Sequence, residues 1–154
     1  MSSSPDLDVP ALLHGAQGFV GLLAPRVQSS AREGALLRLD AGPELHNHLG
    51  GPHAAVLFGL GETAAFAVLL EVFGDLVEAG GVPLVKSSQI AYTAISTGPV
   101  LAASRLLGDE AGARASYESR RTAVFDVEVV FRRESDDVET ARATYAMAVK
   151  RMPS

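Results

Sequence analysis

Three of the four histidines lie close together in the stretch ELHNHLGGPHAAVLFGLGETAAF, which runs from Glu44 to Phe66. They stand beside glycines, and an apolar run with a single carboxylate, Glu62, follows them. Side chains of these types can ligate a metal, transfer protons or act as nucleophiles. This stretch is therefore the first candidate for a functional site, and its spacing decides which chemistry is favoured.

A metal site is one alternative for the histidines. His46 and His48 would lie on one side of an extended segment, and the turn that follows could bring His53 round as a third imidazole. An isolated His-x-His pair lacks the specificity of a full ligand motif, and only Glu44 stands at a ligand spacing as a second carboxylate. We therefore predict no metal here.

Glu62 falls on the apolar side of a predicted long helix. Each helical residue advances by about 100°, so Glu71, Asp75 and Glu78 share one face, which we expect to be solvated. Glu62 lies about half a turn away from Glu71 and faces apolar or small residues. A partly desolvated carboxylate there suits general-base or nucleophilic work, whereas the alternative is a solvated glutamate on a drifting helix face.

The start of the same helix offers donors for a carbonyl oxygen that acquires negative charge. These are the free backbone N–H groups of Ala54 and Ala55, at the positive end of the helix dipole. Since a helix rises about 1.5 Å per residue, His53 and Glu62 lie roughly 13 Å apart and cannot act on one carbonyl within a chain. Two helices packed antiparallel across a two-fold axis would join the two halves, so we predict a homodimer with composite sites.

The elements that position these residues follow from the hydrophobic periodicity. We predict an amphipathic helix over 9–24 with Asp8 as its N-cap, a hairpin that turns at 33–34, and a long helix from Pro52 to about Glu78. Further strands are predicted over 84–96, 99–107, 124–131 and 140–150, with a surface helix over 109–123. This order is of the α+β class, in which an antiparallel sheet wraps the long helix.

Composition is typical of one globular domain over residues 1–154, with 1–8 as a flexible N-terminus: 47% of residues are hydrophobic and 20% charged. The net charge of -5 and the scattered basic residues predict no binding to nucleic acid. The absence of cysteine excludes disulfides and thiolate catalysis. The run 54–70 is short for a membrane span and acidic residues follow it, and the N-terminus lacks the pattern of a secretory signal. We expect a cytoplasmic protein that does not bind membranes.

Residues 47–64 resemble the hotdog-fold acyl-CoA thioesterases, in particular the branch of the phenylacetate-pathway and 4-hydroxybenzoyl-CoA-type enzymes. The pattern there is an asparagine, a glycine three residues on, a histidine six on with two small residues after it, and an acidic residue nine after the histidine. In this sequence these are Asn47, Gly50, His53, Ala54-Ala55 and Glu62. The two alanines stand where the family usually has glycines.

The resemblance implies a hotdog fold, with about five or six antiparallel strands around one central helix and an N-terminal helix. It implies hydrolysis of an acyl-CoA or acyl-carrier thioester in a homodimer or homotetramer. Asn47 and the amides of Ala54 or Ala55 would polarise the thioester carbonyl, and the facing subunit's acidic residue, here Glu62, would attack it or activate water. His53 would help to position Asn47 or the acyl group. Further candidates for substrate contacts are His48, Gly50, Thr63, Lys86, Ser87 and Ser88.

Hydrolysis needs only water and a polarised carbonyl, so no cofactor is expected beyond the CoA of the substrate. Two alternatives stay open. Hydroxyacyl-thioester dehydratases of the same fold place a histidine fourteen residues before a helical glutamate, which is the spacing of His48 and Glu62, although their proline-glycine-valine helix entry is replaced here by residues 55–57. The fold can also bind an acyl thioester or a small apolar ligand without turnover.

Overall fold

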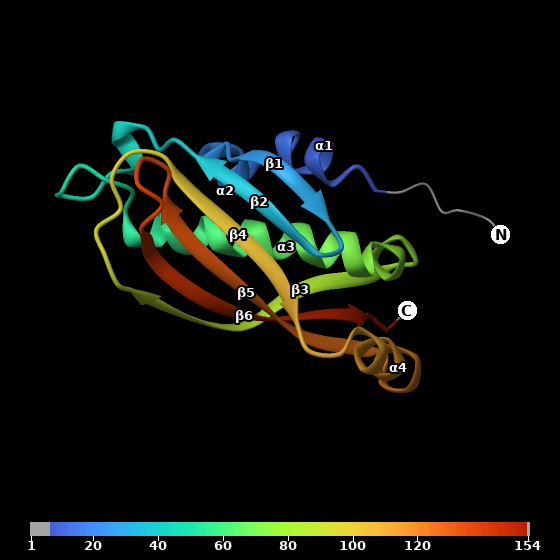
Figure 1. The fold of residues 1–154 in the computed structure, drawn as a ribbon. Coiled ribbons are helices and arrows are strands. Elements are labelled where there is room, and N and C mark those ends of the chain that lie inside the picture. Colours follow the sequence, from blue (N-terminus) through green and yellow to red (C-terminus); the bar gives the residue numbers. More distant parts are fainter. Residues whose placement is uncertain (1–6, 154) are drawn as a thin grey trace.

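The structure is a computed structural model that describes residues 7–153. Over these residues the helices are α1 (Val9–His14), α2 (Gly18–Leu23), η1 (a 3-10 turn, Pro43–Leu45), α3 (Ala54–Glu78) and α4 (Glu110–Arg120). The strands are β1 (Arg26–Ala31), β2 (Gly34–Leu39), β3 (Gly81–Tyr92), β4 (Val100–Leu107), β5 (Thr122–Arg133) and β6 (Glu139–Arg151). The strands form one antiparallel sheet in the order β1-β2-β4-β5-β6-β3, which curves around α3 (Figure 1).

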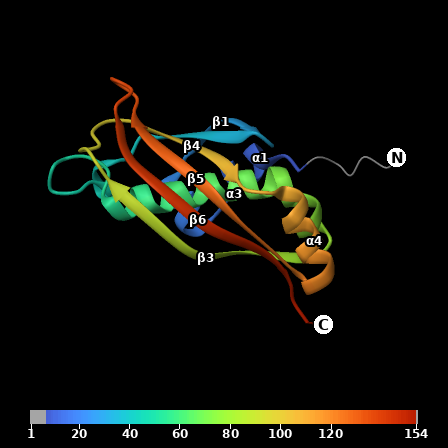
Figure 2. The same cartoon turned by 60° about the horizontal axis from the view of Figure 1, so that its bottom comes forward.

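The core lies between the concave face of this sheet and α3. Since α3 is apolar on nearly every side, it has to be enclosed, and 15 of its 25 residues are buried. It is long and apolar enough to cross a membrane, but 78% of its most apolar window is buried inside the fold. Burial alternates along β2 and β5, so every second side chain points at the helix. The predicted sheet around one long helix is confirmed, and Figure 2 shows β5 and β6 crossing over α3.

Tyr145 of β6 makes a close contact between the sheet and α3. Its hydroxyl donates a hydrogen bond of 2.6 Å to the carbonyl oxygen of Phe58, and its ring lies 5.6 Å from the Phe58 ring. Gly61 makes this approach possible, because a Cβ there would overlap the Tyr145 hydroxyl and lie 2.6 Å from Cζ of Phe131. The contact fixes the helix against the sheet one turn before Glu62.

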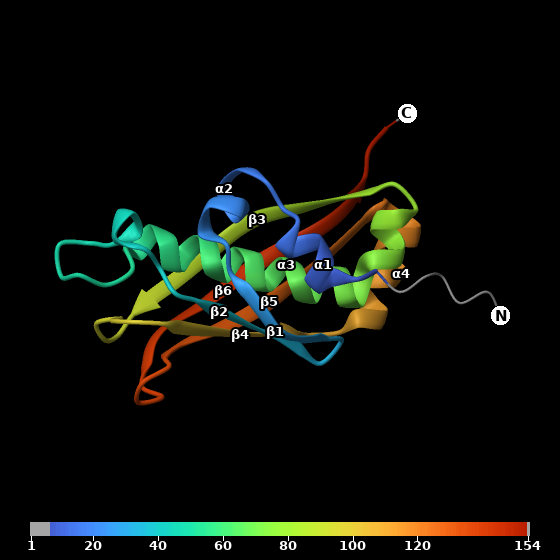
Figure 3. The ribbon, with the colours of Figure 1, turned by 90° about the horizontal axis from the view of Figure 1, so that it is seen from above.

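The single N-terminal helix predicted over 9–24 is wrong, because the chain forms two six-residue helices, α1 and α2. Gly15 caps the end of α1, and Gly18 takes a left-handed conformation with φ of +66° at the start of α2. The apolar periodicity continues through this break and hides it. Asp8 is the N-cap of α1, as predicted, and accepts from Ala11 N at 3.0 Å. Both helices lie across α3 (Figure 3).

Other boundaries differ from the prediction for local reasons. The long helix begins at Ala54, not at Pro52, because His53 is its N-cap and Pro52 forms a β-bridge with His46. β3 begins at Gly81 and includes Pro83, which is tolerated because β3 is an edge strand with one unpaired side. It ends at Tyr92, four residues before the predicted end.

The expected flexible N-terminus over 1–8 lies mostly outside the described residues. Leu7 and Asp8 are described, and both contact the rest of the fold. Leu7 packs against the core and lies over Gly74 of α3, and Asp8 caps α1. The described part of this segment is therefore held in place.

Gly61→Ala tests the close approach of sheet and helix. The added methyl group meets the Tyr145 hydroxyl and the Phe131 ring, so we expect a loss of about 1–3 kcal/mol in the free energy of unfolding, measured by urea denaturation. Tyr145→Phe removes the hydroxyl, and the double variant should lose less than the sum of the two single losses. Strict additivity would contradict this account of the contact.

Candidate functional site

Residues 46–53 form a tight loop at the start of α3. Asn47 N donates to Gly51 O at 2.7 Å, and Gly50 N donates back to Asn47 O at 3.1 Å. Gly50 has a φ of +76°, a left-handed conformation that glycine adopts without strain. Gly51 packs on the carbonyl of Ser96, where a Cβ would find no space. Gly50, which the resemblance named, and Gly51, which it did not, therefore shape this loop together.

The Asn47 side chain is held by the loop that it belongs to. Its Oδ1 accepts from Leu49 N at 2.9 Å and from Gly51 N at 3.3 Å. Both bonds go to the oxygen, so the orientation of the amide group is fixed. The Nδ2 group then has no hydrogen-bond partner within residues 7–153 and keeps its two N–H donors for another molecule.

The first turn of α3 offers fewer free donors than its sequence indicates. His53 caps the helix, and its Nδ1 accepts from Ala55 N at 3.0 Å. This bond places the ring proton on Nε2 and occupies one of the two amides proposed for the oxyanion. The N–H of Ala54 donates to no group among the described residues. One backbone donor thus stays open at the helix start.

Glu62 is a half-buried carboxylate without a hydrogen-bond or ion-pair partner within residues 7–153. It lines a small pocket with the side chains of Leu13, Val20, Thr63 and Phe66. The carboxylate is therefore on the apolar side of α3, as predicted. Eight residues separate it from Ala54, about 12 Å along the helix axis, so one chain cannot bring Asn47 and Glu62 to the same carbonyl group.

Two tyrosines that donate to backbone carbonyls of α3 were not identified from the sequence. The Tyr145 hydroxyl is bound to Phe58 O, and the Tyr92 hydroxyl donates to Ala54 O at 2.9 Å. Burial raises the pKa of Tyr145 above its ordinary value, and the nearby negative charge of Glu62 raises it further. The inward strand position of Tyr145 is a signal that could have identified it, because a buried hydroxyl needs a partner, whereas Tyr92 is exposed and gives no such signal.

The candidate residues predicted on α3 and β3 differ in burial and in the direction of their side chains. Thr63 Oγ1 is buried and donates to Gly59 O at 2.8 Å within the helix. Ser88 pairs with Tyr145 across the β3–β6 ladder, so its side chain points to the same inner face, whereas Ser87 and Lys86 are exposed around a bulge in β3.

Ser88 is also level with Glu62 along the helix. Tyr92 of β3 touches the first residue of α3, and the two elements run in opposite directions. Ser88 lies four residues from Tyr92, about 13 Å along the strand, which matches the 12 Å of helix between Ala54 and Glu62 within about a residue. Ser88 is thus the serine candidate of β3 that lies level with Glu62, whereas the hydroxyl of the adjacent Thr63 is bonded within the helix.

The histidines that suggested a metal site do not converge. His46 Nε2 is bound to the carbonyl oxygen of Ala41 at 2.9 Å, His53 caps α3, and the side chain of His48 is exposed. Within residues 7–153 no three histidine, aspartate or glutamate side chains are grouped in a way that could hold a metal ion. The hydrogen-bond donors that this region presents are Asn47 Nδ2 and the N–H of Ala54.

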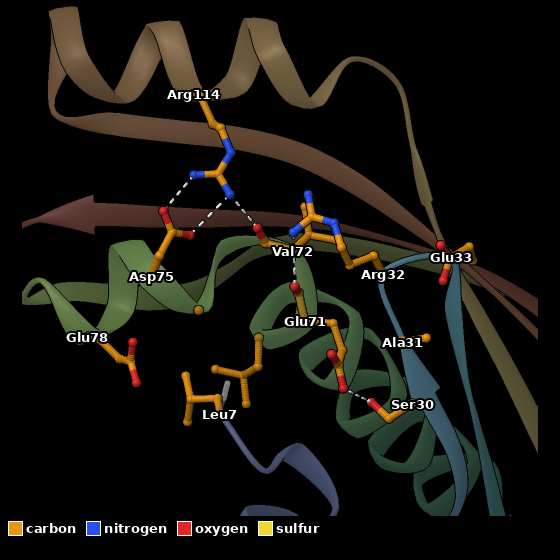
Figure 4. Close-up of a pocket in the computed structure, with 12 residues that line it drawn as sticks. Leu7, Ser30, Ala31, Arg32, Glu33, Glu71, Val72, Asp75, Glu78 and Arg114 are labelled. Carbon is orange, nitrogen blue, oxygen red and sulfur yellow. Dashed lines mark hydrogen bonds and ion pairs between the residues drawn. The ribbon is translucent and has the colours of Figure 1, made fainter. Parts of the chain in front are cut away.

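A larger cavity of about 500 Å³ lies at the other end of α3, on the face that we expected to be solvated (Figure 4). Four of the charged side chains on its lining, those of Arg32, Glu71, Asp75 and Arg114, have polar partners. Arg114 of α4 binds both oxygens of Asp75, at 2.8 and 3.1 Å, and the carbonyl oxygen of Val72 at 2.5 Å. Ser30 donates to Glu71 from the opposite wall.

Arg114 acts at a bend in α3. Phe73 has non-helical backbone angles of -120° and 16°, and the guanidinium lies 5.3 Å from its ring. A side chain that hydrogen-bonds to a backbone carbonyl of a helix, and so interrupts the regular i→i−4 hydrogen bonds, is a known cause of such bends. The cavity is therefore a braced junction of α3, α4 and the β1–β2 hairpin, and we assign no chemistry to it.

Comparisons with known proteins agree with the fold described above. A family model described as "Domain of unknown function (DUF4442)" matches residues 11–149. A Pseudomonas aeruginosa structure described as a probable thioesterase is similar at a TM-score of 0.79 and 20% identity, over 97% of each chain. A structure from Chlorobaculum tepidum TLS, of unknown function, has a TM-score of 0.77 at 12% identity, over 94% of this chain and 93% of that one.

A third structure is a hypothetical thioesterase from Streptococcus pneumoniae TIGR4 with coenzyme A. Its TM-score is 0.61 at 14% identity, over 84% of this chain and 88% of that one. No curated protein matches the chain. At such identities the likeness shows the fold, and the chain has the hotdog fold that the resemblance implied.

Asp75→Asn tests the Arg114 brace through its pH dependence. The hydrogen bonds from Arg114 lower the pKa of Asp75 below its ordinary 3.8, so the stabilisation is complete above that pH and is lost as the pH falls through the folded-state pKa. We expect a loss of about 1 kcal/mol at pH 6 and a smaller one at pH 3, measured by urea denaturation. Glu78→Gln, exposed on the same helix, is the control. An equal loss at both pH values would contradict the ion pair.

Proposed function

We propose that this chain, which belongs to the DUF4442 family, hydrolyses an acyl thioester at sites that two copies of the chain form together. The observation that carries the proposal is Glu62, a half-buried carboxylate without a partner within residues 7–153, beside an apolar pocket on the central helix of a hotdog fold. The coenzyme A in one structural neighbour and the probable thioesterase activity of another support a CoA thioester as the substrate.

The proposed reaction divides between two helices. Glu62 takes a proton from water, and the hydroxide adds to the thioester carbonyl carbon; alternatively, the carboxylate attacks first and water hydrolyses the resulting anhydride. The oxyanion accepts hydrogen bonds from Asn47 Nδ2 and the Ala54 N–H of the other chain. When the intermediate collapses, the C–S bond breaks and the thiolate takes up a proton.

The other residues have supporting roles in this proposal. Ser88 donates its hydroxyl beside Glu62, and His53 fixes the first turn through Ala55 N. The protein works as a dimer in the cytoplasm, and the reaction uses no metal or redox cofactor because water and a polarised carbonyl are sufficient. His48 is exposed in the loop and takes no part in proton transfer.

Non-catalytic binding of an acyl thioester is the second candidate. It is favoured by one observation, the bond from Ala55 N to His53 Nδ1, which leaves a single backbone donor at the helix start. A panel of acyl-CoAs with a thiol reagent separates the two functions. Release of CoA above the buffer rate supports hydrolysis, whereas measurable binding without release supports a binding module.

Glu62→Gln should reduce turnover by about 100-fold or more, because the amide can neither accept the proton of water nor attack the carbonyl. The variant should keep its fold, since Glu62 makes no hydrogen bond or ion pair within residues 7–153. The rate is measured as CoA release, and folding by circular dichroism. Glu78→Gln, the same substitution at an exposed site, should keep the full rate. Unchanged turnover in Glu62→Gln would remove Glu62 from the mechanism.

Mixing two inactive variants tests the composite site. Asn47→Asp keeps the oxygens that accept from Leu49 and Gly51 but removes the Nδ2 donor, so the loop should keep its shape while the rate falls. A heterodimer of Asn47→Asp with Glu62→Gln contains one intact site, so random pairing restores about a quarter of the wild-type rate. Each variant paired with itself is the control. A co-expressed mixture as inactive as its parents would contradict a site shared between chains.

A further inference from the structure

The pocket beside Glu62 has a volume of about 210 Å³ and lies between α3 and the two N-terminal helices. Leu13 of α1 and Val20 of α2 form one wall, and Thr63 and Phe66 of α3 form the other. The Thr63 hydroxyl donates its hydrogen bond within the helix, to Gly59 O. Among the residues that line the pocket, Glu62 is the one with a charged side chain. The pocket is an apolar recess with a carboxylate at its edge.

The way in which α2 docks explains why the recess is at this position. Phe19 and Leu23 of α2 sit over Gly59, where a Cβ would lie 2.8 Å from Phe19 Cζ. The two helices therefore touch at Gly59 and diverge toward Glu62 and Phe66, one to two turns later. The break between α1 and α2 at residues 15–17 brings Leu13 and Val20 over the gap.

We propose that this recess holds the acyl group, and that the substrate is the thioester of a compact, uncharged acyl group, branched or aromatic, of about six to eight carbons. This inference rests on the proposed function, since it places the thioester carbonyl at Glu62. An apolar cavity of about 150 Å³ holds one benzene molecule, so 210 Å³ accommodates a ring with a short extension. A long unbranched chain exceeds this volume.

The chemistry of the lining excludes charged acyl groups. A second carboxylate on the acyl chain would be desolvated among Leu13, Val20 and Phe66 without a hydrogen-bond donor, and Glu62 would repel it. Dicarboxylic acyl groups are therefore poor substrates. A neutral ring or branched chain loses only its apolar hydration when it enters.

Val20 is the residue that sets the size limit. Together with Leu13 it also lines a second pocket of about 160 Å³ on the outer side of the helix pair. Trimming Val20 therefore opens the recess toward additional space, whereas a larger side chain fills it. Leu22, exposed on the same helix and absent from both linings, provides the matched control.

The test compares kcat/KM for acetyl-, isovaleryl-, benzoyl-, phenylacetyl-, palmitoyl- and succinyl-CoA in the wild type, Val20→Ala, Val20→Phe and Leu22→Ala. We expect the branched and aromatic substrates to be preferred. Val20→Ala should raise kcat/KM for larger acyl groups, relative to smaller ones, by about 10-fold. Val20→Phe should lower kcat/KM for the aromatic substrates by a similar factor and leave kcat/KM for acetyl-CoA unchanged. Leu22→Ala should match the wild type. Profiles that are the same in all four proteins, or a preference for palmitoyl- or succinyl-CoA, would overturn the proposal.

Binding of thioether analogues, in which the thioester carbonyl is replaced by CH₂, separates this inference from the proposed function. Calorimetric affinities that follow the size of residue 20, without any hydrolysis of the thioesters, uphold the acyl recess and refute the catalytic assignment. Hydrolysis that depends on Glu62, with analogue affinities indifferent to residue 20, refutes the recess and upholds catalysis. If the protein neither hydrolyses the thioesters nor binds the analogues, both the recess and the catalytic assignment are refuted.

Discussion

The structure depends on the need to enclose α3. A helix that is apolar on nearly every side cannot remain in water, and the six-stranded sheet covers most of it. The sheet cannot close completely, because β1 and β3 are its edges, and α1 and α2 cover part of the remaining gap. Glu62 lies beside this incomplete cover. The site is therefore located where the enclosure of the core helix ends.

The electrophilic half of the proposed site is formed by the loop that precedes α3. A loop of eight residues fixes the oxygen of Asn47 with two backbone N–H groups and leaves the nitrogen to point elsewhere. His53 accepts a hydrogen bond from the N–H of Ala55, and the N–H of Ala54 before it stays open. Glu62 lies on the same helix, about two turns after the first turn that carries these donors. Because this distance is too long for both to reach one carbonyl group, the proposed mechanism needs a second copy of the chain.

Much of the fold follows from the sequence, because periodicity reports burial. The hairpin, the long helix, the alternating strands β5 and β6 and the helix α4 agree with the prediction to within a few residues. The break between α1 and α2 could not be predicted from periodicity, since the apolar pattern runs through it and only the backbone conformation of Gly18 reveals it. The strand predicted from residue 84 begins at Gly81 instead and includes Pro83, which the sheet order permits because β3 is an edge strand.

The site was predictable in part for a similar reason. The side of α3 on which Glu62 lies follows from helical geometry. Which residues of β6 and β3 face that side depends on strand register, and no local sequence pattern fixes the register. Register brings Tyr145 and Ser88 opposite each other, and the bulge after Val85 decides that Ser88 and not Ser87 points inward. The bend at Phe73 likewise depends on Arg114, which is 41 positions further along the chain.

The division of the N-terminal segment into two six-residue helices has a consequence for how such a protein diversifies. α1 and α2 line the recess but add no strand to the sheet, and the buried core takes only Val9 from α1 and Leu23 from α2. Substitutions at the other positions of these short helices therefore remove no side chain from the buried core. The segment that lines the recess can therefore vary in sequence while the sheet and the carboxylate of the proposed site stay the same.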